Sequence, residues 1–466
     1  MAELPQDRLA TTDASGGRVY LYPADVTGRY RSLRVRLRAM LVWIFLLVPW
    51  IQWNGRQIVH LDVANRKFVL FGFQFWAHDV PMAFLLILSF ALAIALVTAV
   101  WGRLWCGWAC PQTVFVEGVY RRVERWIEGP PRTRRARDEG PLSAEKLLRK
   151  ALKYGAFTAV SLVVAHSFLA YFVGSRELLE MIRRSPAENW TPFLVILFTT
   201  ALVMFDFGWF REQFCVIMCP YGRFQSVLMD ESSMIVGYDE KRGEPRRGRA
   251  VGPQGDCVNC LRCVQVCPTG IDIRRGVQME CIACTACIDA CDEVMDTVKK
   301  PRGLIAYTTL KSLGGETSST WRPRTLAYSL LLLSAVLALA LALRQKEPLE
   351  VTLLRAKETP YQQATDAAGA PVVINHFRVD VANQTNGETT VEFTLAEGDR
   401  ARGFEIIVAQ NPQTIPASTH RKIDVFFRFP LLALAAGRAR GHLEVRSPLL
   451  QEKKTLEAAL VGPDGR

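Results

Sequence analysis

The chain has 466 residues, of which 50% are hydrophobic and 22% are charged, and its formal net charge is +12. A mean hydropathy of +0.10 is high for so charged a chain, which argues against a single soluble domain. The composition instead indicates membrane spans joined by charged segments. The length leaves room for two or three domains.

Five apolar runs are long enough to cross a bilayer core, which requires roughly 20 apolar residues. The first of them follows the basic stretch RSLRVRLR, and no small-residue cleavage signature comes after it. This pattern favours an anchor over a removed signal peptide. We therefore expect transmembrane helices at about 37–53, 81–101, 154–174, 190–210 and 325–343.

Lys and Arg residues are concentrated in the N-terminal arm 1–36, in the loop 102–153 and in the segment 211–324. The connections 54–80 and 175–189 carry three Lys or Arg each. Basic residues mark the cytoplasmic side of a membrane protein, so the arm, the loop and the segment are expected in the cytoplasm. The stretch PRTRRAR would also suit nucleic acid, but its place between two spans favours an orientation signal, and no nucleic-acid partner is expected.

Five spans place residues 344–466 outside the cytoplasm, in the periplasm if the cell is a bacterium. In this outer segment, PVVINHFRVDVANQTNGETTVEFTL predicts two alternating strands around an NQTNGE turn. The stretches FEIIVA, IDVFFRF and HLEVRS add strands at short spacing, which favours a β-sandwich. The segment has no cysteine and no catalytic constellation, so docking to a partner is its expected role.

All twelve cysteines lie between Cys106 and Cys291. An exported disulfide scaffold would carry its cysteines in the outer segment instead. The thiols are therefore expected to be metal ligands or redox groups at the cytoplasmic face.

Eight cysteines form two runs with the spacing C-x2-C-x2-C-x3-C. Three thiolates on such a loop bind three irons of a cubane, and in two-cluster ferredoxins the fourth cysteine ligates the other cluster. Zinc sites, the alternative, usually show widely spaced C-x2-C pairs. The first predicted 4Fe–4S cluster is held by Cys257, Cys260, Cys263 and Cys291. The second is held by Cys281, Cys284, Cys287 and Cys267.

The other four cysteines lie in two matching stretches, CGWACP and CVIMCP, each at the end of an apolar run. Residues i and i+4 share a helix face, so Cys106 with Cys110, and Cys215 with Cys219, are expected to project together. The following proline is expected to break each helix just after the second thiol. Parallel internal repeats would then bring four thiols together, and soft thiolates select Cu(I), zinc or iron–sulfur. Small helix-packing cysteines are the alternative.

Other polar groups near the spans have simpler explanations. His166 is expected to bond to a neighbouring helix, although haem ligation and proton relay stay open. Asp206 is expected to pair with Arg211 or a helix end. Three residues of the first outer loop could meet a metal or a quinone, but a structural role is favoured: His60, His78 and Asp79.

The run from FDFGWFREQFCVIMCPYGRF to CIACTACIDACDEVM resembles the cytochrome c oxidase accessory family named CcoG, FixG or RdxA. The likeness covers nearly the whole chain. It implies a polyferredoxin of the bacterial inner membrane that reduces Cu(II) to Cu(I) for the cbb3-type oxidase. It further implies an immunoglobulin-like outer domain, and that the four membrane thiols are the catalytic, copper-linked residues; a further iron–sulfur centre there stays open.

The expected fold is a multi-domain membrane protein. Four helices lie within 37–210, a ferredoxin-like domain occupies 211–324, a fifth helix lies at 325–343, and 344–466 form the immunoglobulin-like sandwich. Expected partners are lipid, a cytoplasmic electron donor, a copper chaperone or transporter, and oxidase assembly proteins. Two other functions stay open: an electron conduit to or from quinone, and a non-enzymatic assembly scaffold with structural clusters.

Overall fold

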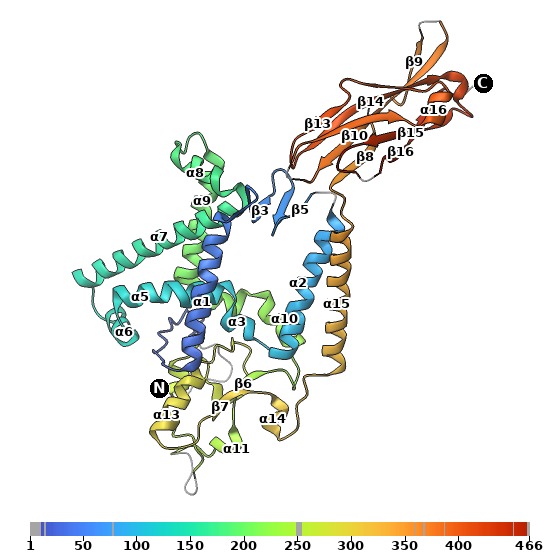
Figure 1. Ribbon diagram of the computed structural model, residues 1–466. Helices are drawn as coiled ribbons and strands as arrows, with labels where there is room; N and C mark the ends of the chain where they lie inside the picture. Colours follow the sequence, from blue (N-terminus) through green and yellow to red (C-terminus); the bar gives the residue numbers. More distant parts are fainter. Residues whose placement is uncertain are drawn as a thin grey trace. The chain divides into compact units, whose positions relative to one another are not determined.

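The computed structural model describes residues 11–13, 15–76, 79–247, 254–357, 359–366, 369–385, 387–450 and 452–463. They fold into two compact units, Met1–Ala340 and Leu341–Arg466, and each is described by itself (Figure 1). His78 lies outside the described residues.

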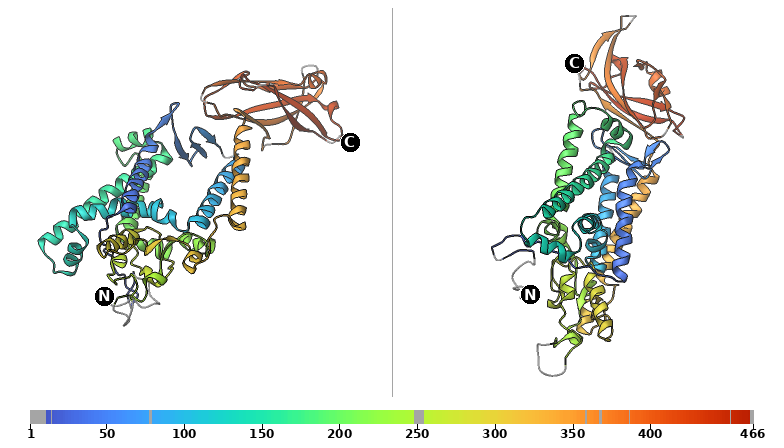
Figure 2. Two further views of the ribbon diagram at one scale, coloured as in Figure 1. Left: turned by 60° about the horizontal axis from the view of Figure 1, so that its bottom comes forward. Right: turned by 90° about the vertical axis from the view of Figure 1, so that its left-hand side faces the viewer.

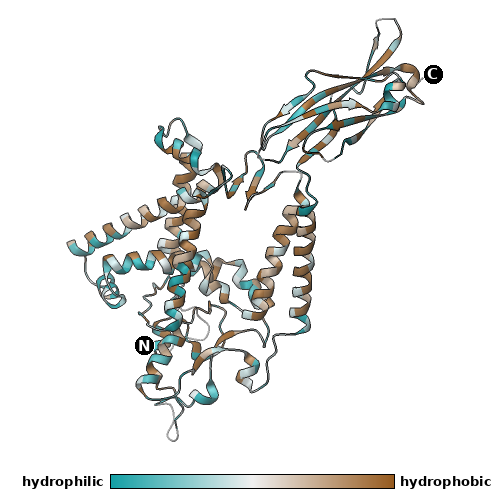
Figure 3. Ribbon diagram, in the orientation of Figure 1, coloured by the Kyte–Doolittle hydropathy of each residue, from teal (hydrophilic) through white to brown (hydrophobic). Residues whose placement is uncertain are grey.

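Among the described residues, four helices are long and apolar enough to cross a membrane. At most 39% of the most apolar stretch of any of them is buried within the protein. Figure 3 shows apolar residues along α2 and α15. A helix suits lipid because its backbone satisfies its own hydrogen bonds. The four helices are α2 (Val80–Trp101), α7 (Ala144–Val173), α9 (Trp190–Val203) with a π-helical continuation (Met204–Phe210), and α15 (Pro323–Arg344).

The helix α1 (Arg29–Leu47) starts and ends earlier than the predicted span 37–53. It starts at Arg29 because the carboxylate of Asp289 accepts hydrogen bonds from the backbone N–H groups of Tyr30 (3.1 Å) and Arg31 (2.7 Å). These bonds satisfy N–H groups of the first turn, which have no partner within the helix. A 3₁₀ turn (Val48–Trp50) and β1 (Gln52–Trp53) follow the helix.

The composition of α1 explains why it is not among the four candidate spans. Five of its first ten residues are arginines, and two of these, Arg34 and Arg38, are 3% and 2% exposed. The basic half therefore packs inside the protein. The second half exposes large apolar side chains, among them Trp43, Ile44 and Leu47. The count of five spans stays a prediction.

The helix α7 begins before the predicted span 154–174 because its first turns pack on two neighbouring helices, α5 (Arg121–Glu128) and α6 (Pro131–Glu139). Lys150 Nζ lies 3.0 Å from Glu128 at the end of α5 and 2.6 Å from Asp138 in α6. Charged residues thus extend the helix beyond its apolar part.

The connection between α1 and α2 forms small antiparallel sheets. In one of them β4 (Lys67–Leu70) lies between β3 (Val59–Asp62) and β5 (Phe73–Phe75). A second pairs β1 with β2 (Arg56–Gln57). Gln57 of β2 accepts a hydrogen bond from the backbone of Ser175 (3.0 Å), where α8 (Ser175–Arg183) follows α7. These short strands were not predicted from the sequence pattern.

The two cysteine runs lie between the strands of one antiparallel pair, β6 (Ile235–Tyr238) and β7 (Ile305–Thr308). Val236, Ile273, Met295 and Leu304 form the apolar core around the cysteines. Figure 2 shows this segment, in green and yellow, from two further sides. Its helices are α11 (Glu240–Gly243), α12 (Arg262–Gln265), a 3₁₀ turn (Ile273–Arg275), α13 (Ala286–Thr297) and α14 (Leu310–Gly314).

The second unit is a β-sandwich, as the strand pattern predicted. One sheet has the order β12-β14-β10-β8, with β9 also paired to β10, and the other has the order β13-β11-β15-β16. The two strands flanking the NQTNGE turn therefore belong to different sheets. The strands are β8 (Leu349–Arg355), β9 (Gln362–Thr365), β10 (Pro371–Asn383), β11 (Thr389–Leu395), β12 (Glu405–Val408), β13 (Gln413–Ile415), β14 (His420–Pro430), β15 (Arg438–Arg446) and β16 (Lys454–Val461).

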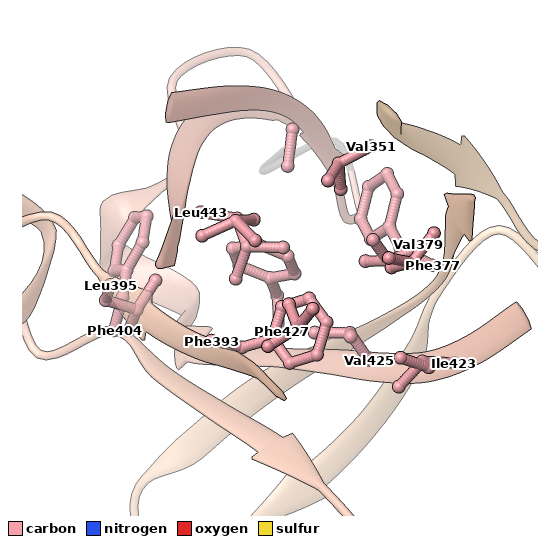
Figure 4. Packing of buried hydrophobic residues seen from close by; sticks show 14 of the residues in the cluster. Val351, Phe377, Val379, Phe393, Leu395, Phe404, Ile423, Val425, Phe427 and Leu443 are labelled. Atoms are coloured by element: carbon pink, nitrogen blue, oxygen red, sulfur yellow. The ribbon is translucent and has the colours of Figure 1, made fainter. Parts of the chain in front are cut away.

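The core of the sandwich is built from alternating residues of both sheets. Val379 and Phe427 of one sheet meet Phe393 and Leu443 of the other, and all four are at most 1% exposed (Figure 4). A short helix, α16 (Glu397–Ala401), follows β11. Apolar burial thus stabilises this unit without disulfides, since it has no cysteine.

Candidate iron–sulfur and thiol site

Two small cavities in the segment between β6 and β7 are lined by the eight cysteines of the two runs. The first cavity is lined by Cys257, Cys260, Cys263 and Cys291. The second is lined by Cys267, Cys281, Cys284 and Cys287, and also by Cys263. Each group combines three cysteines of one run with the fourth of the other. These are the groups of four that the spacing predicted, and cluster binding by them stays a prediction.

The same unusual backbone shapes both cysteine loops. Asn259 and Leu261 in the first run have φ angles of 57° and 59°, and Ala283 and Thr285 in the second have 51° and 62°. Left-handed residues that alternate with ordinary ones turn successive backbone N–H groups toward one side, which favours a negatively charged ligand. Three of the four lack the glycine or asparagine that usually marks such a position, so no local pattern predicts their positive φ angles.

The thiol set fits a multi-iron cluster. Burial raises the pKa of Cys263, Cys281 and Cys291 to about 12, so these sulfurs need a positive partner in order to ionise. Among the described residues, no three His, Cys, Asp or Glu side chains converge on one point that would hold a single metal ion. The thiolates around a cubane are attached to different irons and do not need to converge in this way.

The two membrane cysteine motifs share one backbone course. Each leaves its membrane helix through a residue with a positive φ: Gly102 has φ 56° and ψ −128°, and Arg211 has φ 49° and ψ −118°. A short helix then carries the first cysteine, within α3 (Leu104–Trp108) in one copy and within a π-helical turn (Phe214–Met218) in the other. The repeat inferred from the cysteines is therefore also a repeat of conformation.

The predicted break after the second thiol is misplaced by a residue or more. Each short helix ends before the second cysteine, and Cys110 and Cys219 are extended, with ψ angles of 129° and 110°. Proline disfavours helical geometry in the residue before it. The proline instead starts the next helix, α4 (Pro111–Phe115) or α10 (Pro220–Leu228), at a position where its missing N–H costs nothing. The two thiols of a pair thus do not share one helix.

The structure places the membrane thiols in one neighbourhood, but no three of them converge on one point among the described residues, so the four-thiol site stays a prediction. The Sγ atom of Cys106 donates a hydrogen bond to the buried Oε1 atom of Gln225 on α10, at 3.3 Å, so one motif contacts the helix that follows the other. Burial raises the pKa of Cys215, and the three neighbouring thiols raise it further: Cys110, Cys106 and Cys219. Cys215 therefore lies within electrostatic reach of the other three thiols.

The first thiol motif packs on the loop of the second cysteine run. A Cβ atom at Gly107 would lie 2.5 Å from the carbonyl oxygen of Ile282 and 2.9 Å from Cα of Cys284. Trp108 Nε1 donates to the hydroxyl of Tyr307 (3.0 Å), which in turn donates to the carbonyl of Ala283 (3.2 Å). The backbone of the first thiol motif therefore contacts the backbone of the loop that lines the second cavity.

The second thiol motif reaches the same cavity from another side. Cys215 lines a cleft together with Pro268, Thr269 and Ile282. Pro268 follows Cys267, and Ile282 follows Cys281. Both motifs therefore border the predicted ligands of the second cluster.

Asp206 does not pair with the side chain of Arg211, which was one of its two expected partners; it bonds to Gln112 in the first turn of α4. Its Oδ1 atom accepts a hydrogen bond from Nε2 of Gln112 (3.0 Å), which also donates to the backbone carbonyl of Arg211 (3.0 Å). The side chain of Arg211 bonds instead to Glu124 of α5, at 3.0 and 2.5 Å. Gln112, Glu124 and Gln225 were not singled out from the sequence, because no spacing rule marks a long-range polar partner.

The histidines also differ from expectation. Nδ1 of His166 lies 2.7 Å from the carbonyl of Leu162 in its own helix, so the predicted bond to a neighbouring helix is wrong. His60 is half-buried beside Gly174. Asp79 accepts a hydrogen bond from the backbone of Trp76 (2.8 Å) at the start of α2. These contacts fit structural roles.

Three domain families match the chain: "4Fe-4S binding domain" over residues 83–130, "4Fe-4S dicluster domain" over 210–310, and "IG-like fold at C-terminal of FixG" over 339–463. Together with the apolar helices, they define a multi-domain membrane iron–sulfur redox protein. The second unit is accordingly an immunoglobulin-like domain, as the resemblance implied, and the strand pattern had predicted its β-sandwich.

The chain belongs to the FixG/RdxA family. It is 37% identical to Protein RdxA of Cereibacter sphaeroides over 354 residues, which are 72% of this chain and 75% of RdxA. Protein RdxB of the same organism is 34% identical over 83% of this chain and 84% of its own length. Nitrogen fixation protein FixG of Rhizobium meliloti is 32% identical over 80% of this chain and 79% of its own length.

A crystal structure of a FixG-related protein from Vibrio parahaemolyticus matches 25% of this chain and 97% of that chain, at 11% identity. Its TM-score is 0.19, so it adds nothing to the description of the fold.

Proposed function

We propose that this protein is an iron–sulfur oxidoreductase that reduces Cu(II) to Cu(I) at the four membrane thiols. The Cu(I) would serve assembly of the copper centre of cbb3-type cytochrome c oxidase. Each copper ion takes up one electron, which a cytoplasmic donor supplies. The main support for the proposal is the contact of Gly107 with the backbone of Cys284. This contact places the first thiol motif directly beside the second cysteine run.

The two groups of four cysteines would hold the clusters that carry the electrons. Two 4Fe–4S clusters, when bound, accept and pass single electrons. Cys257, Cys260, Cys263 and Cys291 would hold the first cluster. Cys281, Cys284, Cys287 and Cys267 would hold the second cluster.

The membrane thiols would bind the copper. Thiolate favours Cu(I) over Cu(II), so binding to Cys106, Cys110, Cys215 and Cys219 raises the copper potential and makes its reduction downhill. A further iron–sulfur centre is the alternative occupant. It is supported by the match of residues 83–130, which contain Cys106 and Cys110, to a 4Fe-4S binding domain.

The proposed setting is the bacterial inner membrane. The bias of Lys and Arg supports a cytoplasmic N-terminus and a cytoplasmic segment 211–324. With five spans, the immunoglobulin-like unit is periplasmic and docks to an assembly partner. A copper chaperone or transporter would exchange copper with the thiols.

An apolar cavity of about 330 Å³ favours quinone as the electron partner in a second candidate function. Met229, Met234 and Met279 line it together with Cys281 of the second run. The backbone N–H of Met234 donates to the carbonyl of Val100 at the end of α2 (3.0 Å), so the cavity adjoins a predicted membrane helix. A mostly apolar cavity with a few polar groups is typical of a small-molecule site.

One experiment separates the two functions. Protein purified anaerobically is reduced with dithionite, freed of excess reductant, and mixed with Cu(II) or with a short-chain ubiquinone in a stopped-flow instrument. Copper reduction predicts that Cu(II) reoxidises the clusters and yields one Cu(I) per electron, whereas quinone does not. Reoxidation by quinone alone would support the conduit. Reoxidation by neither would leave the assembly scaffold.

A further inference from the structure

A cavity of about 530 Å³ lies where the basic half of α1 meets α5, α6 and the second cysteine run. The helix α1 contributes three arginines to its lining, Arg31, Arg34 and Arg38. Three more come from α5 and one from α6: Arg121, Arg122, Arg125 and Arg134. The carboxylates in the lining are Asp25 and Glu117. Positive charge therefore exceeds negative charge around this arginine cavity.

Some of these arginines already have carboxylate partners. Arg121 pairs with Glu117 and, at 3.2 Å, with Glu212. Arg125 Nη1 lies 2.7 Å from Asp25, and Arg134 Nη1 lies 2.5 Å from Glu124. These pairs leave the arginines of α1 and Arg122 as the source of the excess charge.

The arginines of α1 are buried with unmet hydrogen-bonding capacity. Nε and Nη2 of Arg34 and Nε of Arg38 are buried and have no hydrogen-bond partner among the described residues. Nη2 of Arg38 donates a hydrogen bond to the carbonyl oxygen of Gly107, at 2.9 Å. A buried charged donor without a partner is costly, and an anion in the cavity would remove that cost.

Electrostatics at the start of α1 agree with this geometry. Burial lowers the pKa of Arg31, and the neighbouring charge of Arg34 lowers it further. Like charges are thus held together without enough counter-charge. A bound anion would relieve their repulsion.

The chemistry of the lining selects phosphate. The guanidinium group presents a planar fork of donors that matches phosphate bidentately, and several such groups together suit a ligand with more than one negative charge. The volume lies within the range of small-molecule sites. The apolar side chain of Trp126, 79% exposed, adds a flat surface to the lining.

We propose that the arginine cavity is a binding site for a phosphate-bearing ligand with at least two negative charges. Val266, Pro268 and Ala286 also line it, and the last two adjoin Cys267 and Cys287 of the second group. A ligand held there would lie beside the predicted second cluster. The phosphate belongs either to a soluble compound or to the headgroup of an anionic lipid, since α1 continues from the cavity into its apolar half.

The test uses the full chain in nanodiscs of phosphatidylcholine, titrated with pyrophosphate by calorimetry at low ionic strength. In a second arm, nanodiscs that contain diphosphatidylglycerol are used, and native mass spectrometry counts the anionic lipid retained by the protein. The variants are Arg34→Gln and Arg122→Gln. The matched control is Arg36→Gln, which removes an exposed arginine from the same helix as Arg34 without touching the lining. Iron content reports whether each variant is folded.

Pyrophosphate binding that weakens at least about tenfold in both cavity variants, and hardly changes in Arg36→Gln, is expected for a soluble ligand. Retention of diphosphatidylglycerol that is lost in the same two variants is expected for a lipid headgroup. Either result supports the phosphate site and names its source. The proposal is overturned if neither probe binds, or if Arg36→Gln weakens binding as much as the cavity variants do.

Discussion

Gly107 lies directly against Cys284: a Cβ atom on Gly107 would come within 2.9 Å of both the backbone nitrogen and Cα of that cysteine. Real Cβ atoms hardly ever come so close to backbone, and backbone cannot swing away as a flexible side chain can. The thiol motif and the second cysteine run are therefore in contact through the absence of a side chain.

Replacement of Gly107 by alanine should push the two loops apart. We expect cupric reduction by the reduced protein to fall about tenfold or more, because small displacements of reacting groups are costly. The iron content should stay close to that of the parent. Gly155→Ala is the matched control, since Gly155 is a helical glycine with no other group within 4 Å of the added Cβ. Equal rates in the two variants would show that the close contact is unimportant for electron transfer.

Iron analysis tests the two cysteine groups. Anaerobically purified protein should hold about eight iron atoms per chain if two four-iron clusters are bound. Cys260→Ser and Cys284→Ser, which each remove one predicted ligand, should lose roughly half of the iron. Four or fewer iron atoms in fully loaded parent protein would contradict the two-cluster prediction.

The cluster ligands could be predicted from the sequence because C-x2-C-x2-C is a local pattern, and cluster binding depends directly on that spacing. The left-handed conformation of Leu261 and Thr285 could not be predicted, since neither is a residue type that favours positive φ. The start of α1 was missed for a similar reason, because its first turn is capped by Asp289, far away along the chain.

Long-range partners account for most of the other differences. Asp206 was expected to pair with Arg211 or a helix end. Tertiary packing instead pairs the side chain of Arg211 with Glu124, and Asp206 bonds to Gln112 in the first turn of α4. In the second unit, the alternation of apolar residues located five of the nine strands that the structure describes, and β8, β9, β13 and β16 were not predicted. Alternation does not indicate which strands pair. It therefore could not predict that β10 and β11 belong to different sheets.

The buried pair of Arg211 and Glu124 should be important for stability. Each side chain is 1% exposed, and Glu124 also forms an ion pair with Arg134. Glu124→Gln would leave uncompensated buried charge, and a loss of about 3–5 kcal/mol in the free energy of unfolding is expected. Thermal unfolding in detergent measures it.

The matched control for that loss is Glu145→Gln. It breaks a pair with Arg149 in which the glutamate side chain is 64% exposed, and such exposed pairs contribute about 0–1 kcal/mol. Similar unfolding temperatures for Glu124→Gln and the parent would contradict a stabilising role for the buried pair.

Reporter fusions test the topology. Alkaline phosphatase fused after Arg466 should be active, because the positive-inside bias and five spans place the C-terminus in the periplasm. The same reporter fused near Gly248 should be inactive. An inactive fusion after Arg466 would mean an even number of spans, as if the four apolar helices crossed the membrane and α1 did not.

The central claim is that copper is reduced at the four membrane thiols, and one variant tests it most directly. Cys106, Cys110, Cys215 and Cys219 are all replaced by serine, and the rate of Cu(II) reduction and the iron content are measured on the same preparation. The proposal predicts that the variant keeps the iron of both clusters and no longer reduces Cu(II). Loss of iron would instead assign the thiols to a further iron–sulfur centre. Reduction of Cu(II) as fast as in the parent protein would contradict the claim.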